Sequence, residues 1–311
     1  MKDTPPAAGH SAYAVLIGAN VIYAAAYASA RVAMEGVPPA TLAFLRLLLA
    51  GLVMLPFLRG RRAQPLSVRE HAAVAGMGVF GFGAAFWLGN LGISLSSSTD
   101  AALLIVIEPL SLMLLGPILL GERLSAREAA GAALAVAGSL LVVLGGVPGL
   151  SAAILPHWRG DLLLVLSGMA FASYSLFGRP VLARADAVRV TVLSIFWGAA
   201  ATLPLAAREW VSGRRPVWTW SSATATIYLA LAVTALGFYL WNWALKRVEA
   251  SRAGIFLNMQ PALGAALGVW WLKESVAPAA LEGGLLSVAG LCLAFWPARS
   301  LAARAREPST G

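Results

Sequence analysis

Charged residues are scarce in this chain of 311 residues. Asp, Glu, Lys and Arg make up 12% of it, whereas soluble domains carry about 25%. Apolar residues make up 59%, and the few charges fall between apolar runs of about 20 residues, the length of a membrane-spanning helix. A transmembrane barrel is excluded, because its strands alternate apolar and polar residues over about 10 positions. The composition therefore predicts an all-α integral membrane protein.

Cysteine and histidine are nearly absent. The single cysteine, Cys292, cannot form an internal disulfide, and His10, His71 and His157 fall in predicted termini or loops. No histidine cluster therefore indicates a metal site. The sequence also lacks a glycine-rich phosphate loop with lysine, and a Ser/His/Asp set within one membrane layer. We therefore predict no metal, no cofactor and no enzymatic activity.

The chain is basic, with a net charge of +9 and a pI near 10.4. In a soluble protein this would suggest nucleic acid as a partner, but in a membrane protein basic loops set the topology. Most of the 23 Lys and Arg residues fall in loops that share one side of the membrane with the N-terminus. We therefore predict that both termini are cytoplasmic and that the chain does not bind nucleic acid.

Ten apolar spans can be placed along the chain, at approximately 12–33, 40–58, 72–93, 100–119, 127–145, 161–180, 190–207, 223–244, 253–272 and 279–297. Segment 146–160 is rich in turn-forming residues and divides the spans into two groups of five. The predicted organisation is a first five-helix repeat at 12–145, an inter-repeat loop at 146–160, a second five-helix repeat at 161–297 and a cytoplasmic tail at 298–311.

The two groups of spans are related by duplication. Matching residues recur at a constant offset of 152 positions: Phe86 with Phe238, Leu88 with Leu240, Asn90 with Asn242, Pro109 with Pro261, and Glu122 with Glu274. Because each copy has an odd number of spans, the second copy must enter the membrane from the opposite side. The sequence therefore predicts ten transmembrane helices in two inverted five-helix repeats. This is an architecture of secondary transporters, which bind substrate near the midplane and work by alternating access.

Several short motifs point to a known family. They are Phe44-Leu45-Arg46 in the second span, the turn Ser96-Ser97-Ser98-Thr99 before the fourth, Glu108-Pro109 and Gly121-Glu122, and the later pairs Gln260-Pro261 and Lys273-Glu274. In these motifs the chain resembles the EamA-type family of the drug/metabolite transporter superfamily, over residues 12–297. The resemblance implies a multi-pass protein of the plasma membrane (the bacterial inner membrane) that exports amino acids or related small metabolites.

Polar residues inside the predicted spans are the candidates for binding substrate, because polar groups that face lipid are costly. Asn20, Tyr23 and Tyr27 share one helix face. Aromatic–amide pairs in the third and eighth spans suit an organic substrate with polar groups. The set expected in a central cavity is Asn20, Tyr23, Tyr27, Arg46, Trp87, Asn90, Tyr174, Tyr239, Asn242 and Gln260. Structural packing or hydrogen bonding between helices is the alternative role for these residues.

Arg46 and Glu108 are the ionisable residues deepest in the predicted spans. They either pair with each other, which would be structural, or act in transport. In the second case Glu108 is the candidate for proton coupling, while Arg46 tunes its protonation or holds an anionic group of the substrate. The matching position in the second half is the neutral Gln260. Pro109 and Pro261 interrupt helices at matched places and predict either hinges or static kinks.

These observations predict a secondary active transporter that exports amino acids or related small organic metabolites by alternating access. The expected partners are a small-molecule substrate and the lipid bilayer, and the chain acts as a monomer or a homodimer. Export of drugs or cationic compounds is the alternative, and an integral-membrane enzyme or a non-transporting scaffold subunit is disfavoured. Proton coupling and facilitated diffusion both remain compatible with the residues, as do export and import.

Overall fold

A computed structural model of the chain describes residues 10–59, 65–108, 110–111, 126–145, 157–182, 184–245 and 259–295, and the regular structure within these ranges is entirely helical. The first half contains α1 (His10–Ala33), α2 (Pro39–Met54), η1 (Leu55–Leu58), α3 (Val68–Gly76), η2 (Met77–Ala84), α4 (Ala85–Leu95), α5 (Ser98–Leu103), η3 (Leu104–Val106) and α7 (Ala126–Gly145). The second half contains α8 (Trp158–Leu182), α9 (Ala187–Val211), α10 (Trp220–Ile227), η4 (Tyr228–Gly237), α11 (Phe238–Leu245), α13 (Met259–Leu272) and α14 (Pro278–Phe295).

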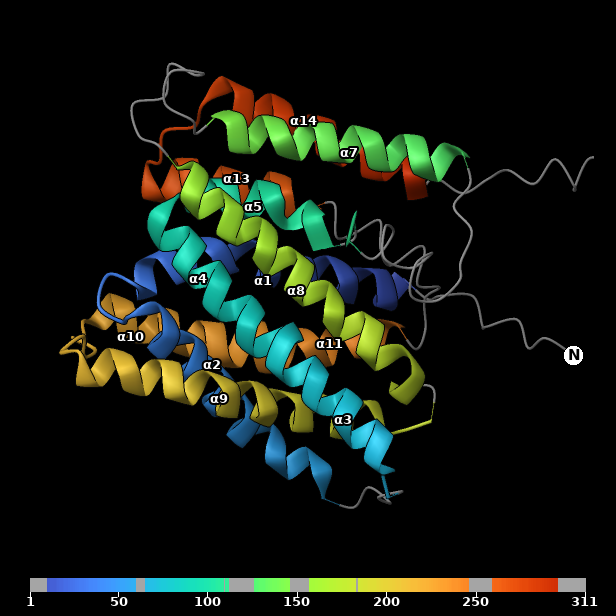
Figure 1. Ribbon diagram of the computed structural model, residues 1–311, viewed down its shortest axis with the longest axis vertical. Coiled ribbons are helices and arrows are strands. Elements are labelled where there is room, and N and C mark those ends of the chain that lie inside the picture. Colours follow the sequence, from blue (N-terminus) through green and yellow to red (C-terminus); the bar gives the residue numbers. More distant parts are fainter. Residues whose placement is uncertain are drawn as a thin grey trace, which may run out of the picture.

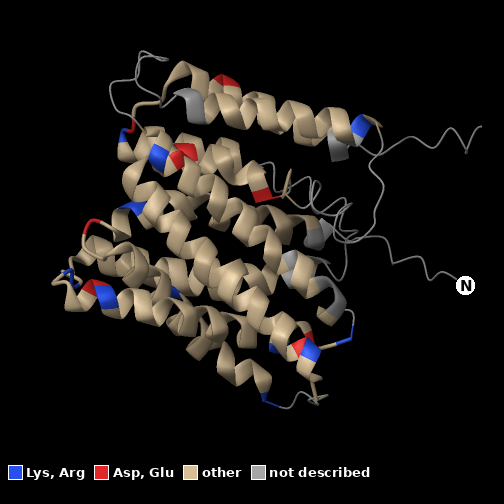
Figure 2. Ribbon diagram, in the orientation of Figure 1, with Lys and Arg blue, Asp and Glu red and all other residues tan. Residues whose placement is uncertain are grey.

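Within the described residues, six helical segments are long and apolar enough to cross a membrane. They are Tyr13–Ala33, Pro39–Leu58, Val68–Leu95, Trp158–Gly178, Ala187–Val211 and Trp220–Trp241. Shorter apolar stretches lie in α7 and α14. The predicted fourth and ninth spans, at 100–119 and 253–272, fall partly outside the described residues. Figure 2 shows the charged residues gathered mostly at the two ends of the helices, with uncharged residues between them, as in a multi-pass membrane protein.

The helices run roughly side by side in stacked layers (Figure 1). Helix α1 packs against α13, α2 against α9, and α4 against α8, while α7 and α14 pair along one edge of the molecule. Small residues permit the closest of these contacts. A Cβ atom added to Gly138 of α7 would lie 2.5 Å from the carbonyl oxygen of Gly283 in α14, so the two backbones touch directly.

Two long helical rods each contain a π-helical segment. In the rod α3–η2–α4 the segment is Met77–Ala84, and in the rod α10–η4–α11 it is Tyr228–Gly237. A shift of 152 residues moves the first segment onto 229–236, inside the second. Wide π turns are rare and occur frequently at functional sites. Each segment leads directly into the residues that carry the matching aromatic side chains Phe86 and Phe238.

One end of the bundle is tied together by glutamates that bind helix N-termini. The Glu209 carboxylate, near the end of α9, accepts hydrogen bonds from the backbone N–H groups of Ala40 and Thr41 at the start of α2, at 3.1 and 2.8 Å. Glu274, in the loop after α13, binds the start of α5 in the same way. Carboxylates satisfy the free N–H groups there and complement the helix dipole. These contacts fix the ends of the helices that surround the cavity described next.

Candidate functional site

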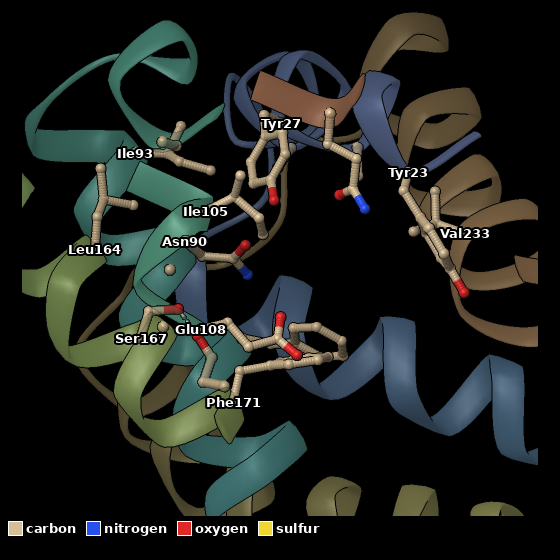
Figure 3. Close-up of a pocket in the computed structure, with 18 of the residues that line it drawn as sticks. Tyr23, Tyr27, Asn90, Ile93, Ile105, Glu108, Leu164, Ser167, Phe171 and Val233 are labelled. Atoms are coloured by element: carbon tan, nitrogen blue, oxygen red, sulfur yellow. Dashed lines mark hydrogen bonds between the residues drawn. The ribbon is translucent and has the colours of Figure 1, made fainter. Parts of the chain in front are cut away.

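A cavity of about 460 Å³ lies among the helices of both halves. Its walls come from α1, α2, α4, the α5–η3 segment, α8, η4, α11 and α13. The wall is mostly apolar and aromatic, and a small number of polar groups interrupt it. Figure 3 shows Tyr27, Asn90 and Glu108 pointing toward the same space. An apolar cavity with a few convergent polar groups is the usual form of a small-molecule site.

Arg46 supplies the positive charge of the cavity. Its side chain is only 7% exposed. The Nε–H group donates a hydrogen bond of 2.6 Å to Oγ1 of Thr234, and Thr234 in turn donates to the carbonyl oxygen of Leu229 within η4. The guanidinium carbon lies 3.9 Å from the centroid of the Phe86 ring, which is a close cation–π contact. The guanidinium is therefore held in place, and its two terminal nitrogens make no hydrogen bond to another described residue, which leaves them for a ligand.

Glu108 supplies the negative charge. It follows η3 and lines the same cavity as Arg46. Within the described part of the chain, no hydrogen bond or salt bridge reaches the Glu108 carboxyl. The two groups therefore do not form the structural ion pair. A carboxyl group that lines a cavity and has no partner among the described residues is available to a proton or to a cationic group.

Two amide side chains are oriented by hydrogen bonds behind the cavity wall. Asn90 donates from Nδ2 to the carbonyl oxygen of Pro39, at 3.0 Å. Gln260 donates from Nε2 to Oδ1 of Asn20, also at 3.0 Å, and Asn20 donates to the carbonyl oxygen of Leu16. Both cavity-lining amides therefore use an N–H group for the protein. Their carbonyl oxygens carry no hydrogen bond from another described residue, so they are acceptors available to a ligand.

Aromatic rings form a continuous wall on one side of the cavity. Phe86, Phe171 and Phe238 line it, and Phe86 and Phe171 lie with their ring centroids 6.0 Å apart. Phe82 lies behind them and makes an edge-to-face contact with Phe238 at 5.2 Å. Rings at these distances stabilise one another beyond simple burial. The wall therefore presents flat apolar ring surfaces to whatever occupies the cavity.

The structure brings together six of the residues that the sequence assigned to this site, and Glu108 is one of them. The six are Tyr23, Tyr27, Arg46, Asn90, Glu108 and Gln260. Asn20 is fully buried behind Gln260. Tyr174 lies behind the aromatic wall, with its ring tilted against Phe82 and its hydroxyl 3.4 Å from Oγ1 of Thr191.

The remaining predicted residues lie elsewhere or outside the description. Trp87 is half-buried and does not line the cavity, and Tyr239 is 42% exposed beside Phe57. Asn242 lies in α11, but its side chain is outside the description. Pro261 is buried in the first described turn of α13, whereas Pro109 is outside the described residues.

Both halves of the chain match a known protein family. The model of the EamA-like transporter family matches residues 10–144 and again residues 158–296. The chain belongs to the EamA-like transporter family. It is therefore a transporter of the membrane, and the resemblance seen in the sequence motifs is confirmed. The two matches together cover most of the chain, and they meet near the segment that divides it in half.

Individual members of the EamA-like family align along nearly the whole chain. A probable terminal-alkyne amino-acid exporter of Streptantibioticus cattleyicolor is 30% identical over 296 residues, covering 93% of this chain and 94% of that protein. The uncharacterized transporter YyaM of Bacillus subtilis is 24% identical over 261 residues, covering 80% and 82%. A solved crystal structure matches with a TM-score of 0.61 and 24% identity over 96% of this chain and 99% of that one, which supports the fold alone.

Several residues of this EamA-like cavity escape sequence reasoning. Phe86, Phe238 and Trp241 line it, and Thr234 holds Arg46 from behind. Phe86 and Phe238 occupy matching positions in the two halves, so the repeat carries a signal that would find them. In each half, the aromatic residue that lines the cavity directly precedes the aromatic residue that the sequence predicted there. Phe86 lines it in place of Trp87, and Phe238 in place of Tyr239. Thr234 gives no such signal, because its role depends on contact with a residue 188 positions away.

Proposed function

We propose that this chain is a secondary active transporter that exports amino acids or related small metabolites by alternating access through the described cavity. The observation that carries this proposal is that one cavity is lined by a fixed cation, Arg46, and by a carboxyl, Glu108, that has no partner among the described residues. An amino acid carries one carboxylate and one ammonium group. The cavity offers one counter-charge for each.

Substrate binding then follows from the geometry of the wall. The substrate carboxylate faces the terminal nitrogens of Arg46, which bind planar anions well. Its ammonium group faces Glu108 and the free carbonyl oxygen of Asn90 or Gln260. The organic side chain packs against Phe86, Phe171 and Phe238. Because the described wall is largely apolar and aromatic, apolar amino acids are the favoured substrates.

The transport cycle rests on the proposed architecture of ten helices in two inverted repeats. The constant offset of 152 residues supports this architecture, as do the two matches of the family model and the π-helical segments at equivalent places. In this architecture the site lies between the halves, and exchange of their conformations exposes it to either side in turn. The termini are cytoplasmic in the bacterial inner membrane, and one chain, alone or in a homodimer, forms the pathway.

Glu108 couples this cycle to protons. When its carboxyl is ionised it holds the substrate ammonium, and when substrate leaves it accepts a proton in place of that cation. The negative charge of Glu108 is thus neutralised by the substrate ammonium in one state and by a proton in the other. Arg46 cannot take this role, because a guanidinium stays protonated under physiological conditions.

Counterflow into proteoliposomes tests the proposal. Purified protein is given a panel of amino acids, organic cations and sugars, with and without a pH gradient. We expect uptake of apolar amino acids that Arg46→Gln abolishes, and a dependence on the pH gradient that Glu108→Gln removes. Ser94→Ala is the control, because Ser94 lies on α4 but is exposed outside the cavity. Flux no higher than in empty vesicles for every amino acid would refute the proposal.

The alternative function is export of cationic drugs. It is favoured by Glu108, an acidic group that lines the cavity and has no partner among the described residues. The two functions differ in their need for Arg46. A cationic substrate needs Glu108 but gains nothing from a fixed guanidinium, so Arg46→Gln should leave its flux unchanged or raise it. Amino-acid flux that Arg46→Gln abolishes supports amino acids, whereas flux of organic cations that only Glu108→Gln abolishes supports cations.

A further inference from the structure

Four polar side chains meet outside the cavity, where the turn between α4 and α5 touches the start of α8. They are Ser96, Asp100, His157 and Asp161. The Ser96 hydroxyl oxygen lies 2.5 Å from Oδ1 of Asp161 and 3.1 Å from Oδ2 of Asp100. Nδ1 of His157 lies 3.3 Å from the same Asp100 oxygen. Two carboxyl groups are therefore linked through one hydroxyl.

This cluster is buried because α4 and α8 cross with almost no space between them. A Cβ atom on Gly160 would lie 2.6 Å from Cβ of Ser96 and 2.7 Å from the carbonyl oxygen of Gly92. The start of α8 therefore pushes Asp161 beneath the turn. Asp161 is completely buried and Asp100 is 8% exposed. Two acidic groups have been placed where water cannot solvate both of them.

The cluster has too few hydrogen-bond donors for two ionised carboxylates. Ser96 has a single hydroxyl hydrogen, and two carboxyl oxygens lie within its reach. Oδ2 of Asp161 is buried and has no hydrogen-bond partner among the residues that the structure describes. A buried carboxylate oxygen left in this way is costly, and such groups usually become neutral instead.

The charges around the cluster leave Asp161 without a cation of its own. The groups that act on it are Asp100 from α5 and His157 from the turn before α8, while Glu274, from the loop after α13, acts on His157. The hydrogen bond with Asp100 raises the pKa of His157 above its ordinary value, although partial burial opposes this. His157 is therefore the counter-ion of Asp100. No equivalent cation contacts Asp161 within the described residues.

We propose that Asp161, Ser96, Asp100 and His157 form a proton-binding site, separate from Glu108, in which Asp161 holds the proton. The proton sits on Oδ1 of Asp161 and is donated to Ser96, whose own hydrogen is donated to Oδ2 of Asp100. Each donor then has one acceptor. Oδ2 of Asp161 becomes the carbonyl oxygen of a neutral acid, which tolerates burial far better than a carboxylate oxygen.

A proton explains the geometry better than a metal ion. The described residues contain no group of three or more acidic, histidine or cysteine side chains that would hold a metal, and the Ser96 hydroxyl already occupies the space between the carboxyl groups. The proton also has a structural effect. It joins the α4–α5 turn to α8, and Ile93, Ala101 and Leu164 of these elements line the cavity. Loss of the proton would leave two ionised carboxylates, Asp161 and Asp100, which would repel each other at this wall.

Infrared spectroscopy of the purified full-length protein tests the proposal, because a protonated carboxyl group absorbs apart from a carboxylate. All variants are made in a Glu108→Gln background, so that Glu108 contributes no such signal. At neutral pH the background protein should show a protonated carboxyl band that Asp161→Asn removes. Glu35→Gln is the matched control. Its carboxyl is exposed in the loop between α1 and α2, and its removal should leave the band unchanged.

Two further variants keep the test decisive if Asp161→Asn does not fold. His157→Gln removes the cation, so the band should persist to more alkaline pH, and Asp100→Asn removes the competing anion, so the band should be lost at lower pH. Opposite shifts support the shared site. A background protein without the band, or a band that none of the three substitutions changes, would overturn it. Neither result depends on whether the protein transports amino acids.

Discussion

Arg46 shows how one buried charge is fixed by residues far away in the sequence. Its Nε–H group is bound by Thr234, whose hydroxyl is itself held by the carbonyl oxygen of Leu229 five residues earlier. In an α-helix the carbonyl acceptor would lie four residues earlier, so the π-helical turn is part of what aims Thr234 at Arg46. The position of the guanidinium therefore depends on the local shape of η4.

Replacing Thr234 tests this dependence. Thr234→Val keeps the shape of a fully buried side chain but removes the hydroxyl, which leaves the Nε–H donor of Arg46 unsatisfied. We expect a loss of about 1–3 kcal/mol in the free energy of unfolding. Affinity for a carboxylate substrate should fall by about tenfold for each 1.4 kcal/mol lost from binding. Thermal unfolding and direct binding to the purified protein measure the two effects.

Thr234→Ser is the matched control for this prediction, since it restores the hydroxyl without the methyl group. It should recover the binding affinity lost in the valine variant. Equal affinity in all three proteins would mean that Thr234 does not position Arg46 for a ligand.

At the same scale, the helix-face rule predicted some cavity residues and missed their neighbours. Tyr23 and Tyr27 are four residues apart and both line the cavity, as their spacing implies. Asn20 lies on the same face but deeper, where Gln260 covers it. Phe86 rather than Trp87 lines the cavity, because neighbouring helical residues point about 100° apart and packing alone selects between them.

The loop after α13 holds the start of another helix, α5. Lys273 adopts a left-handed backbone with φ of 56°, which turns the chain after α13. Glu274 is thereby directed at the start of α5. Its carboxylate accepts hydrogen bonds from the backbone N–H groups and the hydroxyls of Ser98 and Thr99, at 2.7–3.0 Å. One side chain therefore satisfies four donors of a short helix.

Removing this carboxylate should loosen the α5 end of the cavity wall. Glu274→Ala is expected to destabilise the protein by about 2 kcal/mol, because the N–H groups of α5 lose their acceptor and the helix dipole loses its anion. Thermal unfolding of the purified protein measures the loss. Glu35→Ala, at the exposed glutamate between α1 and α2, is the control and should change stability by less than about 0.5 kcal/mol. A similar effect of both substitutions would contradict the capping role.

Much at the level of elements was accessible from the sequence. The apolar runs predicted the positions of α1, α2, α9 and the two long rods well, since a membrane demands length and apolarity of any span. The π-helical segments were not predictable. The sequence of Met77–Ala84 is apolar and glycine-rich without a period that separates a π turn from an α turn.

For the whole molecule, the helical membrane class and the EamA-like family are both confirmed, whereas ten helices and inverted repeats stay predictions. The crossing of α4 and α8 could not be foreseen. It depends on Gly92 and Gly160 meeting across 68 residues of chain, and a single sequence does not show which glycines face each other. For the same reason, the sequence did not predict that the side chains around Asp161 lie together.

Stability of the whole protein should respond to pH through His157, which lies outside the membrane-spanning segments. Its pKa in the folded protein is raised by Asp100, so its protonated form stabilises the fold. This contribution is complete below the unfolded-state pKa of about 6.5 and is lost as the pH rises through the higher folded-state pKa. Wild-type protein should therefore unfold at a higher temperature than His157→Gln in acidic buffer, with the difference vanishing in alkaline buffer.

The measurement is thermal unfolding of both proteins across the pH range. His71→Gln is the control, because a ring nitrogen of His71 approaches a backbone carbonyl at the start of its own helix. A difference between wild type and His157→Gln that is independent of pH would contradict the assigned interaction.

Three of the contacts that shape the cavity join the first half of the chain to the second. Arg46 is held by Thr234, Gln260 by Asn20, and the start of α5 by Glu274. Neither half alone therefore contains a finished recognition surface. If the two halves were produced as separate polypeptides, each would have to find the other before any ligand was bound. The ligand would in turn increase their mutual affinity, so that occupancy of the cavity and cohesion of the protein become thermodynamically linked quantities.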